Sequence, residues 1–306
     1  MRLTKPLAYS LAVLTVTVWS VTFLSTKVLL ARFSPVEILV YRFAIAYVAL
    51  LAVYPKFRKP ASVREELAFF LGGAFGGALY FMGENYALRY SLASSVSLLV
   101  STAPLLTVLA VRIFLPREAE AGRDLGRTVT GSVLALAGVA LTIFNGRFNL
   151  GLNPLGDALA LLSAASWALY TVTVRRLGDG LHPLYVTRKI FFYTLACMVP
   201  VLFFSPVRLD FSAFRDASVL GNLAFLSLIA SCGAYVAWNA AINALGATKA
   251  NNIIYLIPGL TLIFSALLIG EPVTAAAVTG AALTIGGVYL ASAPRKRPSH
   301  KDRKAA

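Results

Sequence analysis

The hydrophobic pattern of the chain consists of long apolar stretches separated by short polar connections. A helix needs about 20 apolar residues to cross roughly 30 Å of hydrocarbon, and stretches of that length predict ten membrane-spanning helices. The expected fold is an all-α membrane protein. The predicted spans cover residues 7–30, 35–54, 67–89, 92–114, 128–144, 155–177, 184–204, 218–245, 248–269 and 273–292.

The composition agrees with a membrane location. Hydrophobic residues make up 58% of the chain and charged residues 13%, with a mean hydropathy of +0.75. A soluble domain could not bury so much apolar surface, so the lipid bilayer is an expected partner. Cys197 and Cys232 fall inside predicted spans, which argues against a disulfide framework. With only two histidines, no metal site is expected, and no cofactor is predicted.

Lysine and arginine are distributed unevenly between the two sides of the predicted helices. Of the 28, 19 fall on the side of the N-terminus, five on the other side and four within spans. The positive-inside rule then places both termini in the cytoplasm of a bacterial-type inner membrane, with a basic tail over residues 295–306. This topology accounts for the net charge of +15, so nucleic acid is not predicted as a partner.

Residues in the first half recur in the second half at nearly constant spacing, which indicates two five-helix repeats over residues 1–148 and 149–294. The matched pairs are Trp19/Trp167, Pro35/Pro183, Asn85/Asn239, Ala87/Ala241, Pro104/Pro258, Gly131/Gly280 and Gly138/Gly287. Because each repeat has an odd number of crossings, the second should enter the membrane from the opposite side. Inverted repeats of this kind are typical of transporters that work by alternating access.

The chain also resembles a known superfamily. The ten-span plan, the tryptophan-centred first helix of each half, the turns "APLLT" and "IPGLT" and the "GEP" of residues 270–272 are similar to EamA-type exporters of the drug/metabolite transporter superfamily. The first half has "PRE" at residues 116–118, a departure from "GEP". The resemblance implies the fold but not the substrate, since the superfamily moves amino acids, sugars, nucleotide sugars, purines and drugs.

One acidic side chain lies well inside a predicted span. Glu84 follows Tyr80 by four residues, so both lie on one helix face. An ionisable group near the bilayer centre costs about 2.5 to 3.5 kcal/mol, so Glu84 requires a partner or water. Three roles are open: a structural ion pair with Lys27 or Arg42, recognition of a substrate amine, and proton coupling.

Aromatic residues supply further candidates. Trp19 and Trp167 lie near the middle of their spans, whereas tryptophans that anchor a protein at the interface lie at span ends. Tyr235, Trp238 and Asn239 share one face of the eighth span. These residues either line a central cavity or pack between helices.

The fourth and ninth spans carry a matched polar and proline stripe: Ser97, Ser101 and Pro104, then Asn251, Tyr255 and Pro258. Proline removes a helical hydrogen bond and frees a carbonyl, which a polar side chain or a ligand can satisfy. Kinks are therefore expected at both prolines, with or without ligand contact. The full set of candidate substrate-binding residues is Trp19, Tyr80, Glu84, Ser101, Trp167, Tyr235, Trp238, Asn239 and Tyr255.

The sequence favours a secondary transporter over an intramembrane enzyme, because it lacks the HExxH, GxSxG and GxxxxGK[ST] motifs. The resemblance to bacterial amino-acid exporters, including aromatic ones, suggests export of small metabolites such as amino acids. Export of drugs, nucleosides or purines is the alternative. The GxxxG pairs Gly72/Gly76 and Gly73/Gly77 predict close helix packing, within a monomer or at a homodimer contact.

Overall fold

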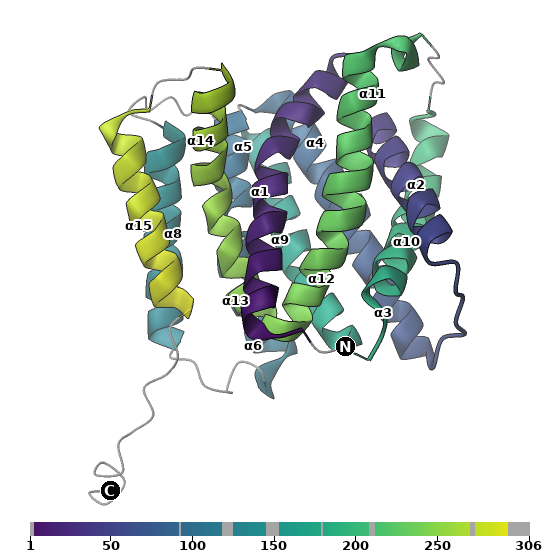
Figure 1. Cartoon of the computed structure of the whole chain (residues 1–306), viewed down its shortest axis with the longest axis horizontal. Coiled ribbons are helices and arrows are strands. Elements are labelled where there is room, and N and C mark those ends of the chain that lie inside the picture. Colours follow the sequence, from purple (N-terminus) through teal and green to yellow (C-terminus); the bar gives the residue numbers. More distant parts are fainter. Residues whose placement is uncertain are drawn as a thin grey trace, which may run out of the picture.

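A computed structural model describes residues 3–91, 93–117, 125–144, 153–178, 180–207, 212–269 and 273–292. All regular secondary structure in these ranges is helical (Figure 1). The "GEP" motif, Glu118 of "PRE", the side chain of Ser97 and the basic tail lie outside the described part of the chain.

The first half contains α1 (Lys5–Leu30), α2 (Pro35–Val53), α3 (Val63–Gly73), the π-helical turn η1 (Ala74–Leu79), α4 (Tyr80–Tyr90), α5 (Ala93–Val100), α6 (Ala103–Phe114) and α8 (Leu125–Phe144). Helix starts follow local chemistry. The Ser34 hydroxyl accepts the Glu37 N–H while the Glu37 carboxylate accepts the Ser34 N–H, at 3.2 and 2.7 Å. This capping box begins α2, and Pro35 occupies its first turn, where a missing N–H has no cost.

The second half contains α9 (Pro154–Leu177), α10 (Pro183–Phe204), the short 3₁₀ turn η2 (Ala213–Arg215), α11 (Ala217–Ala224), the π-helical turn η3 (Phe225–Gly233), α12 (Ala234–Leu245), α13 (Ala247–Asn252), the 3₁₀ turn η4 (Ile253–Tyr255), α14 (Leu256–Ile269) and α15 (Ala275–Ser292). Gly246, with φ of +86°, permits the reversal between α12 and α13.

These elements form ten helical segments whose ends lie within four residues of the predicted spans. Seven of the segments are long and apolar enough to cross a membrane as continuous helices. The fourth span is broken at Ser101–Thr102, two to three residues before Pro104, and the ninth at η4, three to five residues before Pro258. The expectation of ten membrane-spanning helices in an all-α protein therefore agrees with the described structure.

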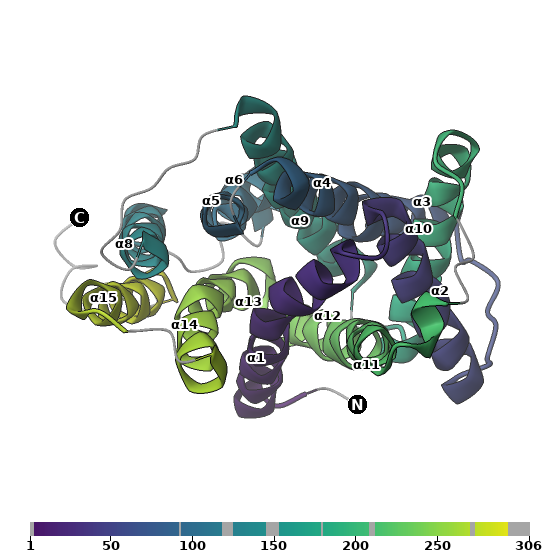
Figure 2. The ribbon, with the colours of Figure 1, turned by 90° about the horizontal axis from the view of Figure 1, so that it is seen from above.

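The two halves interlock instead of packing as separate domains. α1 packs against α12 and α14, and its counterpart α9 packs against α4 and α6. Likewise α2 contacts η3, and α10 contacts η1. Each contact is matched by one in which the halves exchange roles. Figure 2 shows α8 and α15 together at one end of the elongated bundle, with α2, α3 and α10 at the other.

The α8/α15 contact is a seam of glycines. A Cβ on Gly138 would lie 2.5 Å from the Gly280 carbonyl oxygen, and one on Gly131 would lie 2.6 Å from that of Gly287. Because the residue numbers increase in one helix as they decrease in the other, the helices are antiparallel. Only glycine permits this backbone approach.

The GxxxG pairs in α3 and η1 serve contacts within the chain. A Cβ on Gly73 would meet the backbone at Tyr193 and Thr194 of α10, and one on Gly76 would meet the ring of Tyr170 of α9. The predicted close packing is therefore found inside the bundle. The side chains of α9 and α10 fill the space beside these glycines.

Candidate functional site

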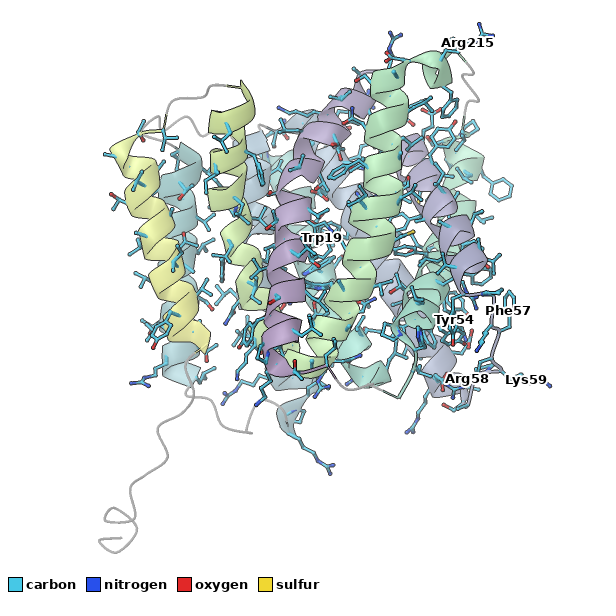
Figure 3. All side chains as sticks on the ribbon, in the orientation of Figure 1. Trp19, Tyr54, Phe57, Arg58, Lys59 and Arg215 are labelled. Carbon is cyan, nitrogen blue, oxygen red and sulfur yellow. The ribbon has the colours of Figure 1, made fainter. Side chains whose placement is uncertain are left out.

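A cavity lies between the two halves near the middle of the bundle, where Trp19 projects from α1 (Figure 3). The space between its walls, together with open solvent at its mouth, is about 610 Å³. Its wall combines aromatic, polar and aliphatic side chains. The lining residues are Trp19, Thr22, Arg42, Tyr80, Phe81, Glu84, Val100, Ser101, Ala103, Trp167, Tyr235, Ile254 and Ile257.

The aromatic side of the wall is a continuous cluster. The Trp19 ring meets that of Trp167 at 5.2 Å with an interplanar angle of 86° and that of Tyr235 at 5.6 Å with an angle of 65°. The Tyr80 ring lies 5.1 Å from Trp167. These are the distances and edge-on angles at which aromatic rings attract one another, so the cluster holds its shape as a rigid wall.

The π-helical turns supply acceptors to this wall. The Trp19 indole N–H donates to the Ala230 carbonyl in η3 at 3.0 Å, and the Tyr235 hydroxyl donates to the Gly76 carbonyl in η1 at 2.9 Å. Gly76 and Ala230 are 154 residues apart and occupy equivalent places in the two halves. A π-helical turn disturbs the regular hydrogen-bond ladder and is frequent at functional sites.

Two buried ionisable side chains, Glu84 and Arg42, line the cavity. Glu84 is 7% exposed and Arg42 is 4% exposed. The Glu84 carboxylate accepts a hydrogen bond from the Tyr80 hydroxyl, and Arg42 is the cation that acts on it electrostatically. Lys27, the other partner considered from the sequence, is exposed on α1.

Contacts with Ser231 and Phe81 hold the Arg42 side chain in place. Its Nε donates to the Ser231 hydroxyl in η3 at 2.6 Å, and its guanidinium carbon lies 4.4 Å from the centre of the Phe81 ring. The sequence presented Arg42 only as an ion-pair partner for Glu84, whereas the structure makes it part of the cavity wall. An ionisable residue inside a predicted span was the available signal.

Six of the nine candidate residues lie on the cavity wall: Trp19, Tyr80, Glu84, Ser101, Trp167 and Tyr235. The remaining three, Trp238, Asn239 and Tyr255, are at most 1% exposed and do not line the cavity. Trp238 backs Trp19 at a ring distance of 5.1 Å, and among the described residues its indole N–H has no acceptor. The breaks in spans four and nine border the cavity through Ser101 and Ile254.

Asn239 belongs to a buried polar network. Its amide oxygen accepts the Tyr170 hydroxyl at 2.5 Å, and its amide nitrogen donates to the Thr187 hydroxyl at 3.0 Å. Both partners belong to the second half, on α9 and α10. The contacts explain why this polar residue is buried without touching the cavity.

A second network, centred on Asn251, joins the two halves. The Asn251 oxygen accepts the Trp167 indole N–H at 2.9 Å, and its nitrogen donates to the hydroxyls of Thr107 at 2.6 Å and Thr171 at 3.0 Å. Asn251 belongs to α13, a short helix that lies near the edge of the bundle where α1 begins (Figure 1). The network therefore links α13 to α6 and to the aromatic wall on α9.

Comparisons with known proteins match this architecture. The profile described as the EamA-like transporter family matches twice, over residues 6–144 and 154–293. A solved crystal structure with 20% sequence identity superposes with a TM-score of 0.71, covering 94% of this chain and 98% of that one. The double match places one copy of the family's unit on each half.

Individual relatives are also similar over nearly their whole length. An "Uncharacterized transporter" of Archaeoglobus fulgidus is 27% identical over 90% of this chain and 95% of its own. The "Uncharacterized transporter YdfC" of Bacillus subtilis is 30% identical over 88% and 86%. A "Probable terminal-alkyne amino-acid exporter" of Streptantibioticus cattleyicolor is 26% identical over 91% of each chain.

Proposed function

Because the chain belongs to the EamA-like transporter family, a family of multi-pass membrane proteins, we propose that it exports amino acids, including aromatic ones, by alternating access. The observation that carries this proposal is the presence of Glu84 and Arg42 together on the wall of an aromatic cavity. An amino acid presents one cation, one anion and one side chain, and the cavity offers a counterpart to each.

The recognition chemistry follows from the positions of these groups. The substrate ammonium would take Glu84, and its carboxylate would take the planar donor fork of Arg42, both through charge-assisted hydrogen bonds. The substrate side chain would lie against the rings of Trp19, Trp167 and Tyr235. A buried charge that loses its partner is strongly destabilising. A zwitterionic substrate would give Glu84 and Arg42 each a new partner of opposite charge, so neither would be left uncompensated.

The relatives support the substrate class only at a distance. One of them is named an amino-acid exporter, and the others cited carry no substrate in their names. The cavity chemistry therefore bears most of the weight. An uncharged drug or a nucleoside could stack on the aromatic wall but would form no ion pair with Glu84 or Arg42.

Alternating access is proposed from the internal symmetry. The antiparallel α8/α15 seam and the exchange-related helix contacts are what two inverted repeats would produce. In such a pair the halves exchange conformations, which moves the opening of a central site from one side to the other. The Asn251 network would then be the closure that parts when the site opens toward the edge where α1 begins.

The topology proposed here puts that edge in the cytoplasm of a bacterial-type inner membrane. α1 begins and α15 ends at the same edge of the bundle (Figure 1), and 19 of the 28 basic residues fall on this side by sequence. Positive charge is retained on the cytoplasmic side of membrane proteins. Both termini would accordingly be cytoplasmic.

Counterflow in proteoliposomes tests the function. Vesicles loaded with phenylalanine should accumulate labelled phenylalanine, and an external excess of other amino acids should compete with it. Trp19→Ala should reduce transport of large apolar substrates most, because their side chains lose contact with the indole ring. Counterflow of nucleosides or cationic dyes without any amino-acid counterflow would contradict the proposal and favour the drug or nucleoside alternative.

A further inference from the structure

A basic loop connects α2 to α3 at one corner of the bundle. We use the name basic loop for residues 54–64, which are the connection itself and the first two residues of α3; they contain four cations, Lys56, Arg58, Lys59 and Arg64, and no acidic residue. All four are exposed. Figure 3 shows Tyr54, Phe57, Arg58 and Lys59 together at this corner, far from Arg215 on the opposite edge.

The loop backbone is held by α10. Arg188, only 3% exposed, donates to the carbonyls of Tyr54 and, at 2.8 Å, of Lys56. The Tyr185 hydroxyl donates to the Arg58 carbonyl at 3.3 Å. A buried arginine is thus used to fix a short surface loop, so its exposed side chains are presented in one arrangement.

The acidic residues next to the loop do not neutralise it fully. The Glu66 carboxylate forms an ion pair with Lys189 at 2.5 Å and accepts a hydrogen bond from the Tyr193 hydroxyl. Glu65 pairs with Arg58 at 3.4 Å, and the Arg58 side chain remains 45% exposed. In the described part of the chain, neither Lys56 nor Lys59 forms an ion pair.

An apolar side chain projects from the centre of the basic loop. The Phe57 ring is 76% exposed although the Arg188 guanidinium carbon lies 4.7 Å from its centre. Val53, the last residue of α2, and Val63, the first of α3, are 70% and 86% exposed. α2 is long and apolar enough to cross a membrane, so its end is where headgroups are expected to replace hydrocarbon.

We propose that the basic loop binds the headgroups of anionic phospholipids, with Phe57 inserted among the acyl chains beneath them. Clusters of four or more basic residues beside a membrane helix attract anionic lipid through charge. The exposed ring adds an apolar contact that a soluble acidic partner would not need. Phosphatidylglycerol meets both requirements.

Brominated lipids, which quench tryptophan on contact, provide the test. The full-length Phe57→Trp protein is placed in nanodiscs of phosphatidylcholine with increasing amounts of brominated phosphatidylglycerol, or of brominated phosphatidylcholine in matched discs. The native tryptophans are at most 8% exposed, and their signal is subtracted using the parent protein. Symmetric discs make the result independent of which way the protein faces in the cell.

We expect half-maximal quenching at a much lower fraction of phosphatidylglycerol than of phosphatidylcholine. Replacing Lys56 and Lys59 by Gln should reduce that preference about 25-fold, at about fivefold per charge. Arg215→Gln, on the opposite edge, should leave it unchanged. The proposal would be overturned if both lipids quenched equally, or if the preference for phosphatidylglycerol survived the double substitution. It would also be overturned if soluble polyglutamate abolished that preference.

Discussion

Glu84→Gln separates recognition of a substrate amine from a purely structural ion pair. The substitution removes the negative charge but keeps the size of the side chain and an oxygen that can accept from Tyr80. A hydrogen bond to a charged group contributes about 1.5 to 3 kcal/mol, which corresponds to about 10- to 150-fold in affinity. The affinity for phenylalanine, which carries an ammonium, should fall by this factor. Its uncharged analogue N-acetylphenylalanine amide should lose little.

The measurement is competition with phenylalanine counterflow in proteoliposomes at matched protein content. Folding is checked first, because an unpaired buried cation can cost about 3 to 5 kcal/mol. Arg42 would keep its bond to Ser231 and its contact with Phe81, which favours survival of the fold. Glu66→Gln is the matched control, since Glu66 pairs with Lys189 at the start of the same helical segment and does not line the cavity.

The result that would refute this reasoning is equal behaviour of the two ligands. If folded Glu84→Gln protein transports phenylalanine at the parental rate, or loses phenylalanine and the analogue by the same factor, Glu84 does not recognise the ammonium. The pair with Arg42 would then be structural. A selective loss shared by Glu66→Gln would also refute it, because that carboxylate is remote from the cavity.

Three further predictions follow from packing, closure and topology. Gly138→Ala should lower the free energy of unfolding by about 1 to 3 kcal/mol, since its Cβ would meet the α15 backbone, whereas Gly286→Ala, with nothing within 4 Å, should be neutral in thermal unfolding. Asn251→Ala should increase solvent access to the cavity from the α1-start edge, measured by hydrogen exchange of α6 and α13; unchanged exchange would contradict its role in closure. In a cysteine-free background, Lys59→Cys and Arg215→Cys should react with impermeant maleimide from opposite sides of the membrane; labelling from one side would exclude the proposed topology.

The spans were predictable because apolar length alone determines them and because proline and serine mark several starts, as at Ser34 and Pro35. Helix breaks lie two to three residues before Pro104 and three to five residues before Pro258. The π-helical turns were not predictable from apolar pattern, since η1 and η3 depend on contacts with the other half. Gly76, for example, accommodates the Tyr170 ring from a helix far along the sequence.

It was harder to predict which candidate residues reach the cavity and which are buried away from it. Tyr235, Trp238 and Asn239 share a helix face, yet only Tyr235 reaches the cavity. Helical spacing gives the face of a side chain but not how many other side chains stand between it and the site. Trp238 is covered by Trp19 from α1, and Asn239 is drawn into bonds with α9 and α10. Neither neighbour is visible in the local sequence.

The glycine seam has a consequence for how the chain is assembled. Gly131 and Gly280 occupy equivalent places, as do Gly138 and Gly287, so Gly138 meeting Gly280 and Gly131 meeting Gly287 are the same contact made twice. This is the geometry of a homodimer interface folded into one polypeptide. In the proposed pair of inverted repeats, a single five-helix unit would carry a surface complementary to itself. Fusion of two such units would make their contact intramolecular, so it would no longer depend on protein concentration.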